Sequence, residues 1–593
     1  MVGGSGVKTA SQLTDLREQW LAQWPAALAC WSRFTKLKEP VWCFTDEDAK
    51  REGLTQSFAM IRLDDHTVVV SLKQIQESKV EAFAIEILAH EIGHHVYAPA
   101  DLTDHGRMIA RMRWGLPTKE HLAGLVSNLY TDLLINDRLQ RSNGLKMAQV
   151  YLTLGGSADR LWQLYMRIYE ILWSQQRYSL AGEFSDTQIE GDAQLGARLI
   201  RHYARDWLDG SGKFAALCLP YLLDDKSMEA NWLKRWRDME NTGQGGFPSG
   251  LVEIEGDEMS GAIHPAYDPE LSGLDESETG EEGKDRRDGS LASSAQGGQP
   301  GQAREPFQFG EILRALGIKL TDHELAVRYY RERAVPYLIP FPEEKKPQAT
   351  DPLPEGLETW DIGMPLNEVD WLESVTRSPR IVPGLTTVQR VWGESPGHEP
   401  EREPLDLDLY VDCSGSMPNP QHSTSFLTLA GTIIALSALR TGARVQATLW
   451  SGARQFITTN GFIRDENEIL RILTGYLGGA TAFPIHILRD TFQDRKPEAR
   501  PVHILHISDD GITTMFEKDE KGNSGWDISE MALKNARGGG TMVLNLWQPW
   551  DKNADLVRAH QQGWQIHVIK DWADLLKFAR EFSQLKYGRS EER

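Results

Sequence analysis

Cysteine is scarce in this sequence. Its 593 residues contain four, Cys30, Cys43, Cys218 and Cys413, and no two of them stand in C-x-x-C spacing. This pattern predicts reduced thiols and excludes a zinc site built from cysteines. Long apolar runs are also missing, because the longest, Phe426–Leu439, is shorter than the roughly 20 residues that span a bilayer. We therefore expect no membrane segment.

Basic residues are too few to balance the acidic ones. The chain has 64 Lys and Arg against 85 Asp and Glu, a net charge of −21, and residues 251–290 alone hold 13 acidic and 3 basic side chains. Such a balance excludes general binding to nucleic acids or to anionic membranes. The first residues lack the charged and apolar regions of a signal peptide, so we expect a cytoplasmic protein. A phosphate-binding G-x-x-x-x-G-K is absent as well, so an ATPase would have to be a separate protein.

What the sequence does contain is a run of five residues, His-Glu-Ile-Gly-His at 90–94, inside a predicted helix. Histidines four residues apart lie on one helix face, so His90 and His94 can bind one zinc ion. Glu91 can then take a proton from a water molecule that the metal holds. This is the spacing of zinc peptidases. The alternative is a buried amphipathic helix whose histidines are incidental.

The segments before this helix predict a small α+β domain. An amphipathic helix comes first and three short strands follow it. A small sheet that leads into the metal helix is the order expected of a minimal zincin, in which an extended peptide substrate adds to an edge strand. The predicted helix covers 8–37, and the strands cover 41–44, 57–63 and 67–72.

Zinc needs a third protein ligand, and the sequence offers three candidates. Asp132, on a second predicted helix at 118–141, is the first choice, and His105 and His121 are the alternatives. Each also has an ordinary interpretation as a polar residue on a helix surface or at a helix start. The metzincin spacing is absent, because position 100 is alanine.

The segment 128–139 resembles the second-helix signature of bacterial metallopeptidase-like proteins that also carry a von Willebrand factor A (VWA) domain. In those proteins an Asp and, four residues later, an Asn follow the H-E-x-x-H helix. The resemblance implies Asp132 as the third zinc ligand. It implies for Asn136 a supporting or structural role beside the ligands.

We expect a multidomain protein. Its first part is a zincin-like α+β domain with a helical extension, and its last is a doubly wound, Rossmann-like α/β domain. An acidic, disordered linker and an ordered connector that wraps on the last domain lie between them. The expected boundaries are 1–145 (zincin-like domain), 146–240 (helical extension), 241–305 (linker), 306–403 (connector) and 404–593 (α/β domain).

A second set of candidate ligands lies in this α/β domain. A predicted strand at 405–411 runs directly into an Asp-x-Ser-x-Ser motif. Doubly wound sheets bind ligands at the carboxyl ends of their strands, so side chains from three loops should meet there. All of them offer hard oxygen atoms, which suit magnesium or manganese. The residues are Asp412, Ser414, Ser416, Thr481 and Asp509, with Asp510 as an alternative to the last.

These five positions resemble a complete metal-ion-dependent adhesion site, so this part is similar to a VWA domain. The resemblance implies that a protein partner supplies an Asp or Glu to an open position on the metal. It also implies a separate MoxR-class AAA+ ATPase as a possible partner, in assembly, metal insertion or bacterial conflict systems such as phage defence.

Two functions follow. The first is a zinc metalloendopeptidase acting on peptide substrates, with a VWA domain that recruits a partner. The second is a non-enzymatic adaptor whose zinc module is structural. Glu91 favours the first, because a structural zinc site has no need of a carboxylate between its histidines.

Overall fold

The computed structural model describes residues 4–54, 57–157, 159–223, 239–240, 247–259, 261–272, 302–339, 352–394 and 404–588. It divides into two compact units. Unit 1 is Met1–Arg333 with Gln421–Thr424, and unit 2 is Ala334–Pro420 with Ser425–Arg593. Each unit has its own sheet and its own hydrophobic core.

Unit 1 contains a small mixed sheet. β2 and β3 form an antiparallel hairpin, and the Asp65 carboxylate stabilises its turn by accepting the Thr67 backbone N–H. β1 joins β3 in parallel and β4 joins β2 in parallel, which gives the order β1-β3-β2-β4. Every residue of β3 is buried, as its near-continuous valine run predicts. The strands are β1 (Val41–Cys43), β2 (Ala59–Arg62), β3 (Thr67–Ser71) and β4 (Met239–Glu240).

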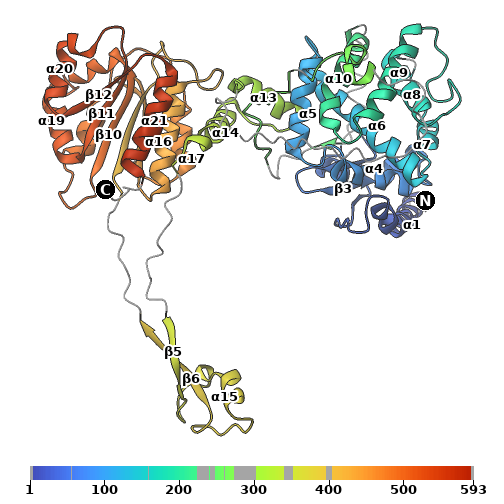
Figure 1. Ribbon diagram of the computed structural model, residues 1–593, viewed down its shortest axis with the longest axis horizontal. Helices are drawn as coiled ribbons and strands as arrows, with labels where there is room; N and C mark the ends of the chain where they lie inside the picture. The colour runs from blue at the N-terminus through green and yellow to red at the C-terminus, as the bar shows by residue number, and fades with distance from the viewer. Residues whose placement is uncertain are drawn as a thin grey trace. The chain divides into compact units, whose positions relative to one another are not determined.

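Helices make up the rest of unit 1 (Figure 1). α4 contacts the sheet through β2 and β3, and it also packs against α1 and α6. α5 packs against α6 and α10, and α8 packs against α9. The helices are α1 (Gly4–Ala29), α2 (Asp46–Arg51), α3 (Leu72–Glu77), α4 (Ala84–Val96), α5 (Leu102–Gly115), η1 (Glu120–Leu122), α6 (Ala123–Asn143), α7 (Met147–Leu154), α8 (Arg160–Leu172), α9 (Thr187–His202), α10 (Trp207–Leu223), η2 (Pro265–Tyr267), α12 (Pro269–Ser272), α13 (Pro306–Ala315) and α14 (Asp322–Ala334).

Part of the acidic segment expected to be disordered is ordered. The described residues within 247–272 pack against helices of unit 1, and Leu251 and Leu271 are each 1% exposed. The buried guanidinium of Arg111 pairs with Glu255 at 2.8 Å and with Asp257 at 3.0 Å. The composition of this segment predicts disorder, but its acidic residues have an arginine partner on α5 and its few apolar residues are buried. Residues 241–246, 260 and 273–301 of the expected linker lie outside the described residues.

The connector expected at 306–403 belongs to two different parts. α13 packs against α5, and residues up to Arg333 group with unit 1. Residues 352–394 form an antiparallel hairpin with one helix, which we call the arm. Its elements are β5 (Pro352–Thr359), η4 (Leu366–Glu368), α15 (Trp371–Arg377) and β6 (Val388–Glu394).

Unit 2 contains a six-stranded sheet in the order β12-β11-β10-β7-β8-β9. Neighbouring strands are parallel, except that β9 is antiparallel to β8. Buried strands such as β7 are shielded on both sides, which explains their continuous apolar pattern. The strands are β7 (Asp406–Asp412), β8 (Val445–Gly452), β9 (Gln455–Thr458), β10 (Val502–Asp509), β11 (Arg537–Asn545) and β12 (Trp564–Ile569).

Helices cover both faces of this sheet, with α16 and α21 packed together on one face and α19 on the other (Figure 1). Among the described helices of the chain, none is both long enough and apolar enough to cross a membrane. The helices of unit 2 outside the arm are η3 (Val335–Tyr337), α16 (Phe426–Arg440), α17 (Glu466–Leu473), α18 (Ile485–Phe492), η5 (Asp510–Phe516), α19 (Gly525–Ala536), η6 (Trp550–Lys552), α20 (Ala554–Gln561) and α21 (Trp572–Tyr587).

Candidate metal centres

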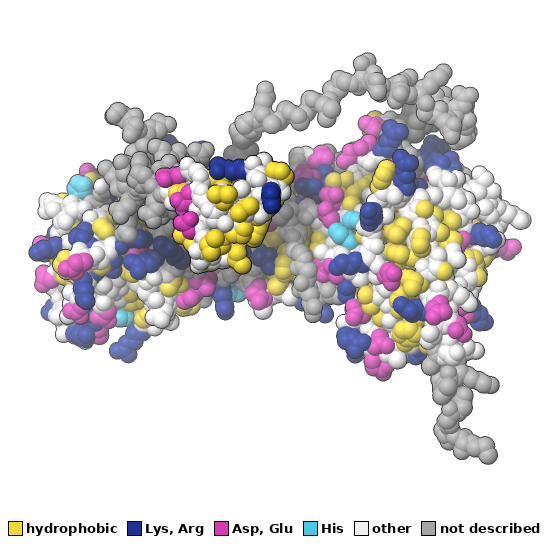
Figure 2. Space-filling view, turned by 90° about the horizontal axis from the view of Figure 1, so that it is seen from below, with side chains coloured by type: hydrophobic (Ala, Val, Ile, Leu, Met, Phe, Trp, Pro, Cys, Tyr) yellow, Lys and Arg dark blue, Asp and Glu magenta, His cyan; other side chains and the backbone are white. Residues whose placement is uncertain are grey.

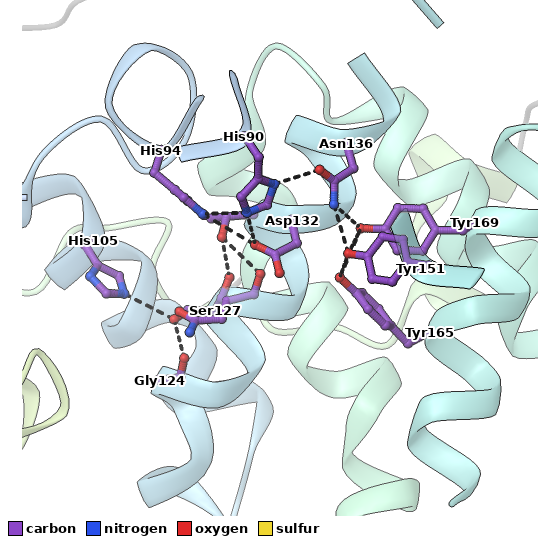
Figure 3. A network of polar contacts seen from close by, with 12 residues as sticks. His90, His94, His105, Gly124, Ser127, Asp132, Asn136, Tyr151, Tyr165 and Tyr169 are labelled. Atoms are coloured by element: carbon purple, nitrogen blue, oxygen red, sulfur yellow. Dashed lines mark hydrogen bonds and ion pairs between the residues drawn. The ribbon is translucent and has the colours of Figure 1, made fainter. Parts of the chain in front are cut away.

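Three ligand atoms from α4 and α6 converge in unit 1 (Figure 3). The Nε2 atoms of His90 and His94 lie 3.2 Å apart, and Asp132 Oδ1 lies 3.6 Å from the first and 3.5 Å from the second. A tetrahedral zinc ion bound at about 2.0–2.1 Å separates its ligand atoms by about 3.3–3.4 Å. The three atoms therefore fit one zinc ion, and no other group of His, Cys, Asp and Glu among the described residues has such an arrangement.

Gly93 permits the close helix packing that creates this arrangement. A Cβ at this position would lie 2.5 Å from Trp31 Cζ2 and 2.7 Å from Ile135 Cγ2. The Trp31 indole also donates to the Ala89 carbonyl at 2.7 Å, which fixes α4 against the end of α1. A side chain at residue 93 would push α4 away from α6, and thus the two histidines away from Asp132.

Asn136 lies behind His90, on the side away from His94 (Figure 3). Its side-chain Oδ1 is 2.7 Å from His90 Nδ1, and its Nδ2 donates to the hydroxyls of Tyr151 and Tyr169, each at 2.9 Å. These two donations orient the amide, so its oxygen must accept from His90. His90 is therefore protonated on Nδ1 and presents the lone pair of Nε2 to the metal position.

Burial keeps the other groups in the states that metal binding needs. Desolvation, with His90 adjacent, holds the pKa of His94 well below its usual value, so this imidazole is neutral at pH 7. Burial, the neighbouring tyrosines and the Asp132 carboxylate raise the pKa of Tyr165 and of Tyr169 well above 10. The tyrosines thus remain protonated beside the metal position.

The other residues predicted for this site lie outside the group of three converging ligand atoms. Glu91 follows His90 on α4 and is 2% exposed. His105, on α5, lies 3.1 Å from the Ser127 hydroxyl, which itself donates to the Gly124 carbonyl. The Nε2 of His105 is therefore a donor, and burial lowers its pKa to about 4. His121 is exposed in η1. Neither alternative ligand belongs to the converging group.

In unit 2 the Asp-x-Ser-x-Ser motif follows β7 at the carboxyl edge of the sheet. Asp412 Oδ1 accepts the Ser414 backbone N–H at 2.8 Å, and the hydroxyls of Ser414 and Ser416 lie 3.2 Å apart. The Ser508 hydroxyl donates to Asp412 Oδ2 at 2.6 Å. Together these bonds hold the carboxylate and both hydroxyls of the motif in one short loop.

Two further loops complete this constellation. The backbone of Gly415 donates to the Gly479 carbonyl at 2.9 Å, which joins the first loop to the one that carries Thr481. A Cβ on Gly511 would lie 2.2 Å from Thr481 Cγ2, so only glycine allows these loops to touch. The Asp509 carboxylate accepts the Gly511 N–H at 2.8 Å and a hydrogen bond from Ser416.

The electrostatics of this second site favour a cation. Burial raises the pKa of Asp412, and the negative charge of Asp509 raises it further. Burial raises the pKa of Asp509 as well, and Asp510 adds to the effect. Carboxylates that repel each other in a partly buried loop gain from a bound divalent ion. Asp510 itself is exposed at the start of η5.

The donor set of this second site is hard. It consists of carboxylate and hydroxyl oxygens, which fit magnesium or manganese. The nearby Cys413 sulfur does not compete, because it accepts the Leu477 backbone N–H at 3.1 Å.

Sequence reasoning missed three kinds of residue around these sites. Tyr165 and Tyr169 lie one turn apart on α8, but Tyr151 lies on α7, so no motif joins the three tyrosines. Ser508 could have been found, because β10 pairs with β7 in parallel and Ile507 is opposite Val411, which places Ser508 beside Asp412. Trp547, 95% exposed, lies two residues beyond Asn545, the register partner of Asp509, and is therefore near this edge of the sheet.

No protein-family model matches the chain, and no curated protein matches it. Pilus adhesin SpaC from Lactobacillus rhamnosus GG matches with a TM-score of 0.23 and 11% identity, over 32% of this chain and 31% of that one. The conserved hypothetical protein BatB from Bacteroides thetaiotaomicron matches with 0.20 and 13%, over 30% and 98%. A mutant of the PilB minor pilin from Streptococcus sanguinis matches with 0.23 and 10%, over 35% and 71%. Likenesses this low carry no argument about fold or function.

Proposed function

We propose that unit 1 is a zinc-dependent peptidase centre, with His90, His94 and Asp132 as metal ligands. The observation that supports this most directly is the convergence of two imidazole nitrogens and one carboxylate oxygen at 3.2–3.6 Å. Zinc prefers such a mixed nitrogen and oxygen set in tetrahedral geometry, and three protein ligands leave one position for a water molecule or substrate.

In this proposal the residues around the metal have separate tasks. A zinc ion there would polarise a peptide carbonyl and lower the pKa of a water molecule. Glu91 would accept the proton of that water and pass it to the leaving amine. Asn136 would keep His90 in the tautomer whose Nε2 binds the metal.

Glu91→Gln tests the catalytic role. This variant should retain one zinc per chain, measured by elemental analysis, and should lose cleavage of a quenched-fluorescent peptide library by at least about 100-fold. Glu86→Gln is the matched control, because Glu86 lies on the same helix and its carboxylate accepts the Lys146 backbone N–H. If the Glu91→Gln variant cleaves the peptides as fast as the wild-type protein does, the catalytic assignment is overturned.

A structural metal is the second candidate, and burial favours it. The side chains of His94 and Asp132 are 0% and 3% exposed, and that of His90 is 11% exposed. A closed site of this kind can contribute folding energy without turnover. Chelation would then lower the thermal stability of unit 1, and Glu91→Gln would leave all biological function intact.

For unit 2 we propose a VWA-type adhesion site that binds magnesium or manganese and recruits a protein partner through an Asp or Glu. This is supported by the hydrogen-bonded loop of Asp412, Ser414 and Ser416, which bonds to Gly479 in the loop that carries Thr481 and to Asp509. The resemblance of the motif suggests a separate MoxR-class AAA+ ATPase as the partner to test first.

Calorimetric titration with magnesium tests this second proposal. Asp412→Ala should abolish magnesium binding and partner binding together, without unfolding unit 1. Asp509→Asn and Asp510→Asn form a matched pair, and only the first should weaken magnesium binding. Loss of magnesium binding in Asp510→Asn alone would identify Asp510 as the ligand. Unchanged magnesium binding in Asp412→Ala would refute the site.

A further inference from the structure

Helix α15 of the arm exposes its apolar residues and buries a serine, which is the reverse of an ordinary surface helix. The side chain of Ser374 faces inward and is 0% exposed. Its hydroxyl donates to the Asp370 carbonyl at 2.6 Å and accepts the Val388 backbone N–H at 2.9 Å, which attaches the helix to β6. Trp371 and Leu372 are 53% and 74% exposed. A surface helix normally buries its apolar stripe and turns its polar residues to water.

Exposed apolar side chains continue from α15 over the rest of the arm. Of the 24 large hydrophobic residues that are exposed in the described part of the chain, nine fall within 362–392. Figure 2 shows hydrophobic side chains gathered on the face of the arm that is turned to the viewer. We call these nine residues the apolar face of the arm: Ile362, Met364, Leu366, Trp371, Leu372, Val375, Val382, Leu385 and Trp392.

The arm presents this face on an ordered scaffold. β5 and β6 pair along their length, and the Trp360 backbone N–H donates to the Thr387 carbonyl at 2.9 Å. Arg390 pairs with the Asp370 carboxylate at 2.6 Å at the start of α15. Gly384, with a φ of +74°, lies directly against Ile362, since a Cβ there would be 2.9 Å from Ile362 Cγ1. The two loops that carry exposed side chains therefore touch.

The size of the face matches a protein interface. Nine such side chains, between 37% and 77% exposed, present roughly 800 Å² of apolar surface, about what one partner contributes to an interface of standard size. Monomers seldom leave more than about 300–600 Å² of contiguous apolar surface in water.

Charge selects among the possible occupants. Residues 352–394 contain seven Asp and Glu against three Arg, a net charge of −4. Two copies of the face would bring like charges together, and an anionic lipid surface would be repelled in the same way. The chain as a whole is also acidic, at −21, so its own surface is a poor complement.

We propose that the apolar face of the arm is a docking surface for a separate protein whose contact region is apolar at its centre and rich in Lys and Arg at its rim. Buried apolar area supplies the affinity, and the net negative charge of the arm supplies orientation and selectivity. This surface shares no residue with either metal centre, so it does not depend on the functions proposed for them.

Two amphipathic helical peptides test the proposal with the full-length protein. Both carry the same Leu and Trp stripe, one flanked by Lys and Arg and the other by Glu, and binding is followed by fluorescence polarisation. The basic peptide should bind at least 10-fold more tightly, and added salt should reduce the difference. Equal binding of the two peptides, or no binding of the basic one, would overturn the proposal.

Matched variants locate the binding surface. Leu372→Ser with Leu385→Ser should weaken the basic peptide by at least 10-fold, while Leu585→Ser, at a residue 79% exposed on α21, should not. All three positions are exposed, so thermal unfolding should be unchanged. Sedimentation of the full chain separates the other occupants. A concentration-dependent dimer that the double variant loses would replace the partner by a second copy, and co-sedimentation with anionic vesicles would replace it by a lipid surface.

Discussion

The amide oxygen of Asn136 lies 2.7 Å from Nδ1 of His90, whereas the opposite ring nitrogen of His90 lies 3.6 Å from Asp132. One imidazole therefore connects an oriented amide to the metal position. Asn136→Leu should lower zinc affinity by about 10–100-fold, because the tautomer and orientation of His90 are no longer fixed.

Competition with a chromophoric zinc chelator measures this loss. Asn136→Asp should restore most of the affinity, because a carboxylate also accepts from Nδ1–H and from tyrosine hydroxyls. Asn143→Leu is the control on the same helix, where the side chain is exposed and donates only to the Cys30 carbonyl. Equal affinity in Asn136→Leu and wild type would show that His90 is held by other contacts.

Gly93→Ala should destabilise unit 1 by about 1–3 kcal/mol, because the new methyl group overlaps Trp31 and Ile135. It should also weaken zinc binding, since α4 and α6 must separate. Thermal unfolding with and without zinc measures both effects. Gly191→Ala provides the contrast, because that glycine is exposed on α9 and an added Cβ would meet no atom outside the local helix backbone within 4 Å. Alanine there should stabilise the helix by about 0.5–1 kcal/mol.

Ser508→Ala should weaken magnesium binding and make it more sensitive to acid. Burial already raises the pKa of Asp412, and the hydrogen bond from Ser508 lowers it. Without that bond the pKa rises further, so protons compete with the cation from a higher pH downward. Titrations at pH 7.5, 6 and 5 should show the magnesium affinity decreasing as the pH is lowered. In the variant this decrease should begin at a higher pH. Thr513→Ala, which removes only a bond to the Asp510 carbonyl, should match wild type.

Acid should destabilise unit 2 through His506, a buried imidazole on β10. Tyr410, Phe483 and Trp564 surround its ring. Burial lowers the pKa of His506 to about 3 in the folded protein, from 6.5. As the pH is lowered, His506 takes up a proton in the unfolded chain before it does so in the folded protein. Its contribution to the stability of the fold is therefore full above pH 6.5 and is lost as the pH falls towards 3, at up to about 1.4 kcal/mol per pH unit.

His506→Phe should remove this share of the acid sensitivity, since a phenyl ring keeps the aromatic packing and has no titrating nitrogen. Hydrogen exchange of peptides from β10 at pH 7 and pH 4 is the measurement, because a chain of two units does not unfold in one step. His503, whose pKa burial lowers to about 4, should account for part of the remaining loss. An unchanged pH dependence in His506→Phe would show that other groups dominate.

Several parts of this molecule were predictable because their determinants are local. A predicted helix at 90–94 already places His90 and His94 one turn apart, and α4 extends over both. The Asp-x-Ser-x-Ser loop follows a buried strand, and the spacing of its side chains depends on a few consecutive backbone bonds. In contrast, residue spacing favoured Asp132 but left His105 and His121 as alternatives, because three helices had to be packed before any distance existed.

The sequence by itself determined which chemical groups this protein can use: two histidines with a glutamate on one helix, and hard oxygen donors after strands of a second unit. These follow from helical and strand periodicity, which short stretches of chain specify. Only the tertiary structure decided that Asp132 completes the first group, that Asn136 sets the tautomer of His90, and that the arm exposes its apolar residues. Those features depend on contacts between distant segments, where the packing of Gly93 against Trp31 and Ile135 sets distances that no local pattern encodes.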